Sequence, residues 1–208
     1  MDNIGRNSGN NAPVNPFFPP GYVLLLGSRS PRRAEILAKT DIPFKTVDID
    51  FDENASGLKD PVDLARAKSR AYAEPLRPHE ILLTADTVVR LDGEILGKPA
   101  DREEARKMLE RLSGRVHEVE SGVCLRSPAD EICFSEITRV RFRLLSPKEI
   151  SYYLRHYRPW DKAGAYGIQE WIGLAAVCGL EGDYYNVMGL PACRTLLELQ
   201  RLIPGTIK

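Results

Sequence analysis

The feature that most limits the fold is a short apolar run that leads directly into a helix start. Residues 22–26 are Tyr-Val-Leu-Leu-Leu and end at Gly27, a pattern typical of a buried strand. Ser30 and Pro31 then supply a helix N-cap and a first helical residue, so a helix is expected to about residue 39. A buried strand that turns at once into a helix favours a fold in which helices cover a sheet.

The rest of the chain predicts a mixture of strands and helices. Apolar or alternating stretches predict strands at residues 44–49, 81–89, 94–96, 116–125, 132–145, 174–180 and 184–188. Capping residues and prolines predict helices at residues 61–74, 102–113 and 147–156, and from residue 191 onward. Because strands and helices do not alternate strictly, we expect an α/β or α+β fold with a mixed sheet.

The N-terminus differs from the remainder of the chain. Residues 1–20 are rich in Asn, Pro and Gly and show no apolar periodicity, apart from the pair Phe17 and Phe18. Such a segment cannot bury enough apolar surface to offset the entropy of ordering it. We therefore predict a flexible extension over residues 1–20 and one folded domain over residues 21–208.

Composition excludes several classes of protein. Lys plus Arg is 29 and Asp plus Glu is 29, so the chain lacks the net basic charge that grips long nucleic acid. The four cysteines form no CxxC pair, which argues against a structural zinc site and a disulfide scaffold and favours a reducing compartment. No apolar run is long enough to span a bilayer, and no secretion signal precedes the domain. We expect a cytoplasmic protein without a membrane segment.

Two arginines stand at the wrong end of the first predicted helix. Arg32 and Arg33 lie in its first turn, where unpaired backbone N–H groups and the helix dipole already make the end positive. A bound polyanion would resolve this conflict, because phosphate oxygens accept from backbone N–H groups, guanidinium groups and the hydroxyls of Ser28 and Ser30. The alternative is a solvated pair of arginines. The stretch is not a Walker A loop, since it has no GK[ST].

Asp86 lies inside the apolar run of residues 81–89. An ionised carboxylate in such a place is costly unless it is paired or holds a metal. If residues 92–93 form a two-residue hairpin turn, Thr87 is expected opposite Lys98, so an acid, a hydroxyl and a lysine come within one strand spacing. The alternative is an aspartate that caps a neighbouring loop.

Two further charged groups are candidates for a site. Lys68 lies on the apolar stripe of its predicted helix, where a lysine usually extends its ammonium to solvent. Asp50, Asp52 and Glu53 follow a predicted strand. They form either a solvated loop or a set of oxygen ligands for Mg²⁺ or Mn²⁺.

Six blocks of sequence occur in an order that is similar to the Maf family of nucleotide pyrophosphatases, over about residues 23–203. The blocks are Ser28-Arg29-Ser30-Pro31-Arg32-Arg33, Ala85-Asp86-Thr87, Gly97-Lys98-Pro99, Leu112-Ser113-Gly114-Arg115, residues 161–169 (DKAGAYGIQ) and residues 186–191 (NVMGLP). Six ordered blocks make the resemblance far more specific than any one of these motifs.

The resemblance implies a fold, an activity and partners. The fold is an α/β structure with flanking helices around an elongated mixed sheet, in two lobes around a cleft, related to inosine triphosphate pyrophosphatase. The activity is hydrolysis of a nucleoside triphosphate between its α and β phosphates, which gives a monophosphate and pyrophosphate. It requires a divalent cation (Mg, Mn or Co). A small-molecule nucleotide, a cytoplasmic location and a homodimer are further expectations.

The resemblance also assigns roles to residues. It places the catalytic proton acceptor at Asp86 and an acidic, metal-binding position at Glu53. Phosphate-binding positions fall on Ser28, Ser30, Arg32, Arg33, Lys68 and Lys98. Positions that determine substrate specificity fall on Arg32, Thr87 and Gln169. Whether Asp86 acts as a base, a metal ligand or both is left open by the sequence.

Residues 162–169 resemble the branch of the family that acts on dTTP and UTP rather than on 7-methyl-GTP, with a housekeeping role against unwanted or modified nucleotides. The chain departs from many members at Gly27, where they have alanine, and at Glu170 and Trp171, where they have glycine after Gln169. The alternatives are a non-enzymatic, nucleotide-binding regulator of cell division and the same reaction on a modified purine triphosphate. DNA binding through Arg32 and Arg33 is disfavoured by the zero net charge.

Overall fold

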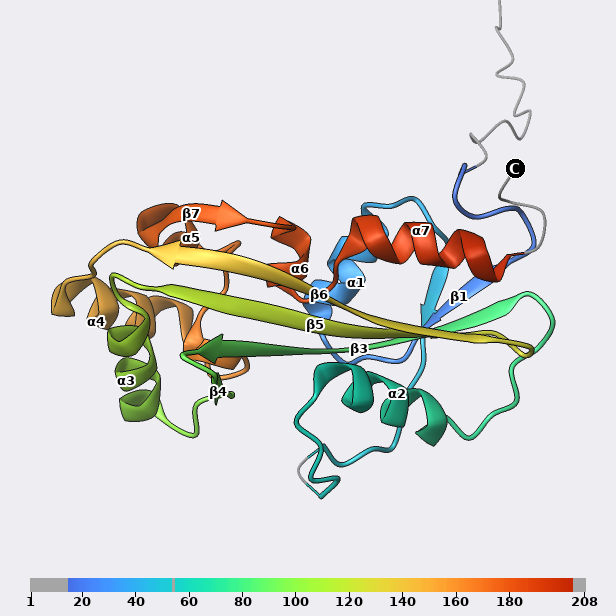
Figure 1. Ribbon diagram of the computed structural model, residues 1–208, viewed down its shortest axis with the longest axis horizontal. Helices are drawn as coiled ribbons and strands as arrows, with labels where there is room; N and C mark the ends of the chain where they lie inside the picture. The colour runs from blue at the N-terminus through green and yellow to red at the C-terminus, as the bar shows by residue number, and fades with distance from the viewer. Residues whose placement is uncertain (1–14, 54, 204–208) are drawn as a thin grey trace, which may run out of the picture.

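A long mixed sheet of seven strands forms the centre of the molecule, shown in a computed structural model that describes residues 15–53 and 55–203 (Figure 1). The strand order is β2-β1-β3-β5-β6-β7, with β4 beside β3; β1 pairs in parallel with β2 and β3, and the other neighbours are antiparallel. The predicted mixed sheet is therefore confirmed. The strands are β1 (Val23–Leu26), β2 (Phe44–Thr46), β3 (Glu80–Leu91), β4 (Glu94–Leu96), β5 (Val116–Arg126), β6 (Glu131–Phe142) and β7 (Val177–Glu181).

Helices lie along both halves of the long strands, with α1 and α6 near the middle (Figure 1). At one end α2 and α7 lie on opposite sides of the sheet, and at the other end α3 packs against α4 and the turn η1. None of the helices within the described residues is long and apolar enough to cross a membrane. The helical elements are α1 (Pro31–Ala38), α2 (Pro61–Ala71), α3 (Arg102–Leu112), α4 (Pro147–Tyr157), η1 (Ala163–Ala165), α5 (Trp171–Ala176), α6 (Tyr184–Met188) and α7 (Ala192–Leu202).

Side-chain alternation along β3 sends neighbouring residues to opposite faces of the sheet. The hydroxyl of Thr84 donates to the carbonyl of Ala65 on α2 at 2.6 Å, so even-numbered residues of this stretch face α2. Asp86 therefore also faces α2. Thr87 faces the other side, where its hydroxyl accepts a hydrogen bond from Arg33 at 3.1 Å.

A glycine allows α2 to lie close to the sheet. Gly122 on β5 is the direct partner of Asp86 in the ladder. A Cβ atom added there would overlap the backbone of Pro61 and Val62 at the start of α2. The missing side chain therefore permits the close approach of α2 to the sheet, which sets the distance between α2 and Asp86.

Of the two strands predicted near the C-terminus, one is wrong and the other begins later than expected. Residues 184–188 form the short helix α6, because the Asp183 carboxylate accepts from the backbone N–H of Tyr185 at 2.7 Å and caps its first turn. The helix ends at Gly189, whose φ of 120° few other residues adopt. The strand expected at 174–180 is shorter, because residues 171–176 form α5 before β7 begins. Periodicity alone does not separate short apolar helices from strands.

The predicted flexible extension is wrong for its last residues. Phe18 is 3% exposed, joins the main core and contacts the ring of Tyr22 edge-on at 6.0 Å. The side-chain amide of Asn15 donates to the carbonyl of Thr40 at 2.7 Å. One buried aromatic ring anchors the segment without any periodic pattern that a sequence could show. Residues 1–14 lie outside the described residues, so that part of the extension stays a prediction.

Truncation distinguishes the two parts of this segment. Removal of residues 1–14 is expected to leave the melting temperature unchanged, because their sequence offers no apolar pattern to bury. Removal of residues 1–20 also deletes the buried ring of Phe18, which costs about 3 kcal/mol and lowers Tm by roughly 6–12 °C. Scanning calorimetry of both truncations and of full-length Phe18→Ala measures this. Equal melting of the two truncations would contradict the anchoring role of Phe18.

Candidate active site

A cleft of about 1380 Å³ is lined by residues of α1, α2 and α6 and of the turn η1. Its walls come from the β1–α1 corner, the middle of β3, the connection after β4 and the loop from Asp161 to Gln169. All ten predicted site residues line it, namely Ser28, Ser30, Arg32, Arg33, Glu53, Lys68, Asp86, Thr87, Lys98 and Gln169. The structure thus brings together residues that lie up to 141 positions apart, from Ser28 to Gln169.

The cleft is positively charged although the chain as a whole is neutral. Eight lysine and arginine side chains line it, against four aspartates and glutamates. A concave site with one dominant sign of charge concentrates ligands of the opposite sign. This local excess of cations suits a polyphosphate.

The N-terminus of α1 faces the cleft, and few groups of the protein satisfy its backbone N–H groups or offset its positive charge. Ser30 is at the N-cap position but its side chain makes no capping bond, and the first turn contains no acidic residue. The hydroxyl of Ser28 instead accepts from the backbone N–H of Ser30 at 3.2 Å. The N-cap residues of three other helices do accept from backbone N–H groups: Asp60 caps α2, Asp101 caps α3 and Ser146 caps α4. The first turn of α1 is therefore the uncapped one of these four, as expected for an anion-binding end.

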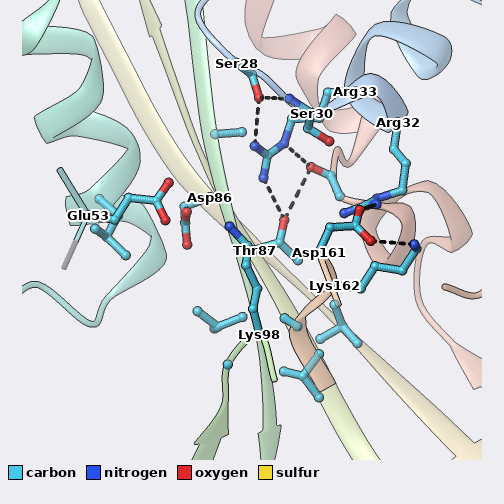
Figure 2. A pocket seen from close by; sticks show the side chains of 18 of the residues that line it. Ser28, Ser30, Arg32, Arg33, Glu53, Asp86, Thr87, Lys98, Asp161 and Lys162 are labelled. Atoms are coloured by element: carbon cyan, nitrogen blue, oxygen red, sulfur yellow. Dashed lines mark hydrogen bonds and ion pairs between the residues drawn. The ribbon is translucent and has the colours of Figure 1, made fainter. Parts of the chain in front are cut away.

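Arg33 is fixed by three hydrogen bonds within the protein (Figure 2). Its guanidinium donates to Ser28 Oγ at 3.0 Å, to Thr87 Oγ1 at 3.1 Å and to the carbonyl of Gly189 at 2.8 Å. Burial lowers the pKa of Arg33, while the charge of Asp86 acts to raise it. The group therefore contributes a cation of fixed position, and it ties α1 to β3 and to the segment before α7.

Arg32 joins the two walls of the cleft. Its guanidinium pairs with the carboxylate of Asp161 at 2.7 Å, and Asp161 also pairs with Lys162 at 2.8 Å (Figure 2). Burial acts to raise the pKa of Asp161, but hydrogen bonds from Lys162 and Arg32 outweigh it and lower the pKa to about 2. Neither Asp161 nor Lys162 was predicted as a site residue, although both stand in a block that carries the family resemblance.

Lys68 bridges two carboxylates. Its ammonium lies 2.7 Å from Asp86 Oδ1 and 2.6 Å from Glu53 Oε1. The side chains of Lys68 and Asp86 are only 11% and 13% exposed, whereas that of Glu53 is 44% exposed. Burial acts to raise the pKa of Glu53, but the hydrogen bond and charge of Lys68 outweigh it and hold the pKa below its usual range. Asp86 is thus a buried acid kept beside a cation.

Lys98 reaches the same region from the other wall. The ladder between β3 and β4 pairs Leu91 with Glu94, as predicted, and ends where Val89 pairs with Leu96. The predicted pairing of Thr87 with Lys98 lies beyond that end. Figure 2 nevertheless shows the Lys98 ammonium pointing toward Asp86 and Thr87, and its charge also lowers the pKa of Glu53.

The carboxylates of Asp86 and Glu53 fit a divalent cation. Both place an oxygen within 2.7 Å of one ammonium, so a positive charge already occupies the space between them. Mg²⁺ is usually held by one or two carboxylates together with substrate phosphates, which is the set that this cleft offers. The one group of three side chains with metal-ligand spacing among the described residues, Cys124, Glu131 and Cys133, does not line the cleft.

Gln169 lines the cleft with an unused acceptor. Its Oε1 is buried and has no hydrogen-bond partner within the described part of the chain. A Cβ atom added to Gly167 would lie 3.1 Å from Gln169 Nε2, so the glycine leaves room for the amide. A buried acceptor without a partner is costly unless a ligand satisfies it.

A buried polar network beneath this loop was not predicted. Tyr153 accepts from the backbone N–H of Gly167 at 3.1 Å and donates to Glu170, whose other oxygen pairs with Lys162 at 3.1 Å. Burial and the hydrogen bond to Glu170 raise the pKa of Tyr153. Glu170 departs from the family pattern, and its contacts with Tyr153 and Lys162 hold the loop in place. Trp171 packs against Tyr152 at 5.0 Å between ring centroids.

Comparison with known proteins supports the family resemblance that these site residues carry. The family model described as "Maf-like protein" matches residues 23–202. A protein of Porphyromonas gingivalis named dTTP/UTP pyrophosphatase is 50% identical over 186 residues, which cover 86% of this chain and 94% of that protein. Proteins with the same name are 44% identical in Phocaeicola vulgatus, over 87% of this chain and 96% of the relative, and 48% identical in Symbiobacterium thermophilum, over 85% and 92%. The chain belongs to the Maf family.

Proposed function

We propose that this protein hydrolyses dTTP and UTP between the α and β phosphates and releases the monophosphate and pyrophosphate. The observation that carries the proposal is the buried carboxylate of Asp86, which stands beside Lys68 in a cleft with a large excess of cations. The relatives named dTTP/UTP pyrophosphatase align with almost the whole domain and support the same reaction.

The cleft offers fixed positive charges that can bind the triphosphate and hold it in position. Arg32, Lys98 and the open N–H groups of α1 lie where they can neutralise its oxygens, and fixed cations favour the charge that develops during phosphoryl chemistry. A divalent ion held by Asp86 and Glu53 would act as a Lewis acid on those oxygens.

Asp86 is the proton acceptor in this proposal. A carboxylate has about four acceptor sites, so the bond from Lys68 leaves capacity for a water molecule. Asp86 removes a proton from that water while the oxygen of the water attacks the α phosphorus. The bond from the α phosphorus to the bridging oxygen breaks, and pyrophosphate leaves.

The reaction is tested with a panel of nucleoside triphosphates that contains dTTP, UTP, CTP and representative purines, each with Mg²⁺ or Mn²⁺. We expect monophosphate and pyrophosphate, the highest kcat/KM for dTTP and UTP, and no turnover in EDTA. Release of diphosphate and orthophosphate would refute the reaction. Faster hydrolysis of a purine triphosphate would refute the base preference alone.

Substitution of Gln169 tests how the base is selected. The edge of uracil and thymine that pairs with adenine presents an N–H between two carbonyls, whereas cytosine has no hydrogen on that ring nitrogen. The unpaired Oε1 of Gln169 is buried, and it can accept from that N–H once the side chain turns its amide toward the cleft. We therefore expect Gln169→Ala to lower kcat/KM for dTTP and UTP about ten- to a hundredfold and to reduce their advantage over CTP. An unchanged preference in steady-state assays would assign base selection to other residues.

A further inference from the structure

Two cysteines outside the cleft lie side by side on the same face of the sheet. Cys124 on β5 and Cys133 on β6 are direct partners in the antiparallel ladder. Their sulfur atoms are 2.6 Å apart and share a hydrogen bond. Direct partners on antiparallel strands have Cα atoms about 4.5–5.5 Å apart, which is within the range that a disulfide spans.

The spacing of the sulfurs favours a covalent bond over a shared metal. A disulfide places its sulfurs about 2.05 Å apart, so closing the bond needs a movement of about half an ångström. Two thiolates on one zinc ion, each about 2.3 Å from the metal in a tetrahedral site, lie about 3.8 Å apart. Glu131 is near enough to be a third ligand, but it already pairs with Arg66 at 3.4 Å and with Arg70 at 3.6 Å.

The two thiols differ in their exposure to solvent and in how readily they lose a proton. Cys124 is fully buried, whereas Cys133 is partly exposed. The hydrogen bond with Cys124 lowers the pKa of Cys133, and the charge of Arg66 acts in the same direction. A reagent from solvent therefore meets Cys133 first, and Cys124 is placed to attack the product.

The geometry points to Cys124 and Cys133 as a redox-active dithiol that forms a reversible disulfide by exchange with a low-molecular-weight disulfide. The Cys133 thiolate attacks one sulfur of that disulfide, giving a mixed disulfide on Cys133 and one free small thiolate. The Cys124 sulfur then attacks the sulfur of Cys133 and expels the second small thiolate, which takes up the Cys124 proton. The two protein thiols are oxidised and the one small disulfide is reduced to two thiols.

Peptide mapping tests this site directly with oxidised glutathione as the probe. Trypsin cuts after Arg115, Arg126 and Arg139, so the two cysteines fall in separate peptides, residues 116–126 and 127–139. We expect the folded protein to yield these peptides joined by a disulfide, and to yield them singly after treatment with a phosphine reductant. Mixed disulfides only at the exposed Cys178 and Cys193 would overturn the proposal.

Single substitutions test the order of attack. Cys124→Ala is expected to accumulate glutathione on Cys133, because no neighbouring thiol remains to displace it. Cys133→Ser should form neither adduct nor cross-link at this site, since Cys124 is buried. The matched control Cys178→Ser removes an exposed cysteine elsewhere and should keep the cross-link. Stable glutathione on Cys133 in the unaltered protein would refute the role of Cys124.

A metal titration distinguishes the other chemistry that these ligands offer. Reduced protein is titrated with Zn²⁺ by calorimetry, and the same titration is made on Cys133→Ser and Glu131→Gln. We expect no stoichiometric binding that depends on Glu131. Binding of one Zn²⁺ that is lost in both variants would overturn the disulfide and make the cluster a metal site.

Discussion

Asp86→Asn is expected to lower kcat for dTTP by on the order of 10²–10⁴, which is the usual contribution of a general base. Asparagine keeps the size of the side chain and an oxygen that can accept from Lys68, which lies 2.7 Å from Asp86 Oδ1. It cannot remove a proton from water. Steady-state assays in saturating Mg²⁺ measure the rate, and calorimetry with dTTP measures binding, which should remain largely intact.

The matched control is Asp63→Asn. Asp63 is an exposed acid on α2 outside the cleft, so the same chemical change there should leave turnover unaltered. Near-normal turnover of Asp86→Asn would refute its role as proton acceptor. If the variant instead loses affinity for Mn²⁺, followed by electron paramagnetic resonance, Asp86 is chiefly a metal ligand.

Lys68→Met is expected to lose both turnover and about 3 kcal/mol of stability. The substitution removes the ammonium that lies between Asp86 and Glu53 and leaves the buried Asp86 carboxylate without its cation. Breaking a buried ion pair by removing one partner costs about 3–5 kcal/mol, and the exposure of Glu53 places this case at the lower end. Urea denaturation of the two proteins measures the loss.

A double substitution isolates the electrostatic cause. Asp86→Asn in the Lys68→Met background removes the unpaired charge and should restore part of the stability. The deficit of Lys68→Met should also shrink as the pH falls, because Lys68 holds the pKa of Glu53 below its usual range, and the stability that this shift contributes at neutral pH is lost in acid even in the unaltered protein. A deficit that is independent of pH, with no recovery in the double variant, would attribute the loss to packing.

The sequence predicts best where a residue violates a local rule. Asp86 in an apolar strand and Arg32 and Arg33 at a positive helix end are costly in isolation, so the amino-acid order alone indicates that each needs a ligand or partner. The long strands are equally predictable, because buried and more exposed residues alternate over residues 116–121 of β5 and 137–142 of β6.

What the sequence misses depends on contacts between distant residues. The burial of Phe18 depends on a core assembled from the whole chain, and the helix α6 on one side-chain cap. The support that Tyr153 and Glu170 give to the loop of Gln169 exists only because α4 lies beneath that loop. Phe18 and Glu170 stand out in the sequence, but no local pattern shows which distant residues these side chains contact.

Gly122 has a consequence for how mutational data on this protein are interpreted. A methyl group at this position would overlap the backbone at the start of α2, and the displaced helix carries Lys68 away from Asp86. An alanine scan would therefore score Gly122 among the residues required for turnover. Yet the residue supplies no functional group to the reaction, so a loss of activity there reports a helix position and not a chemical role.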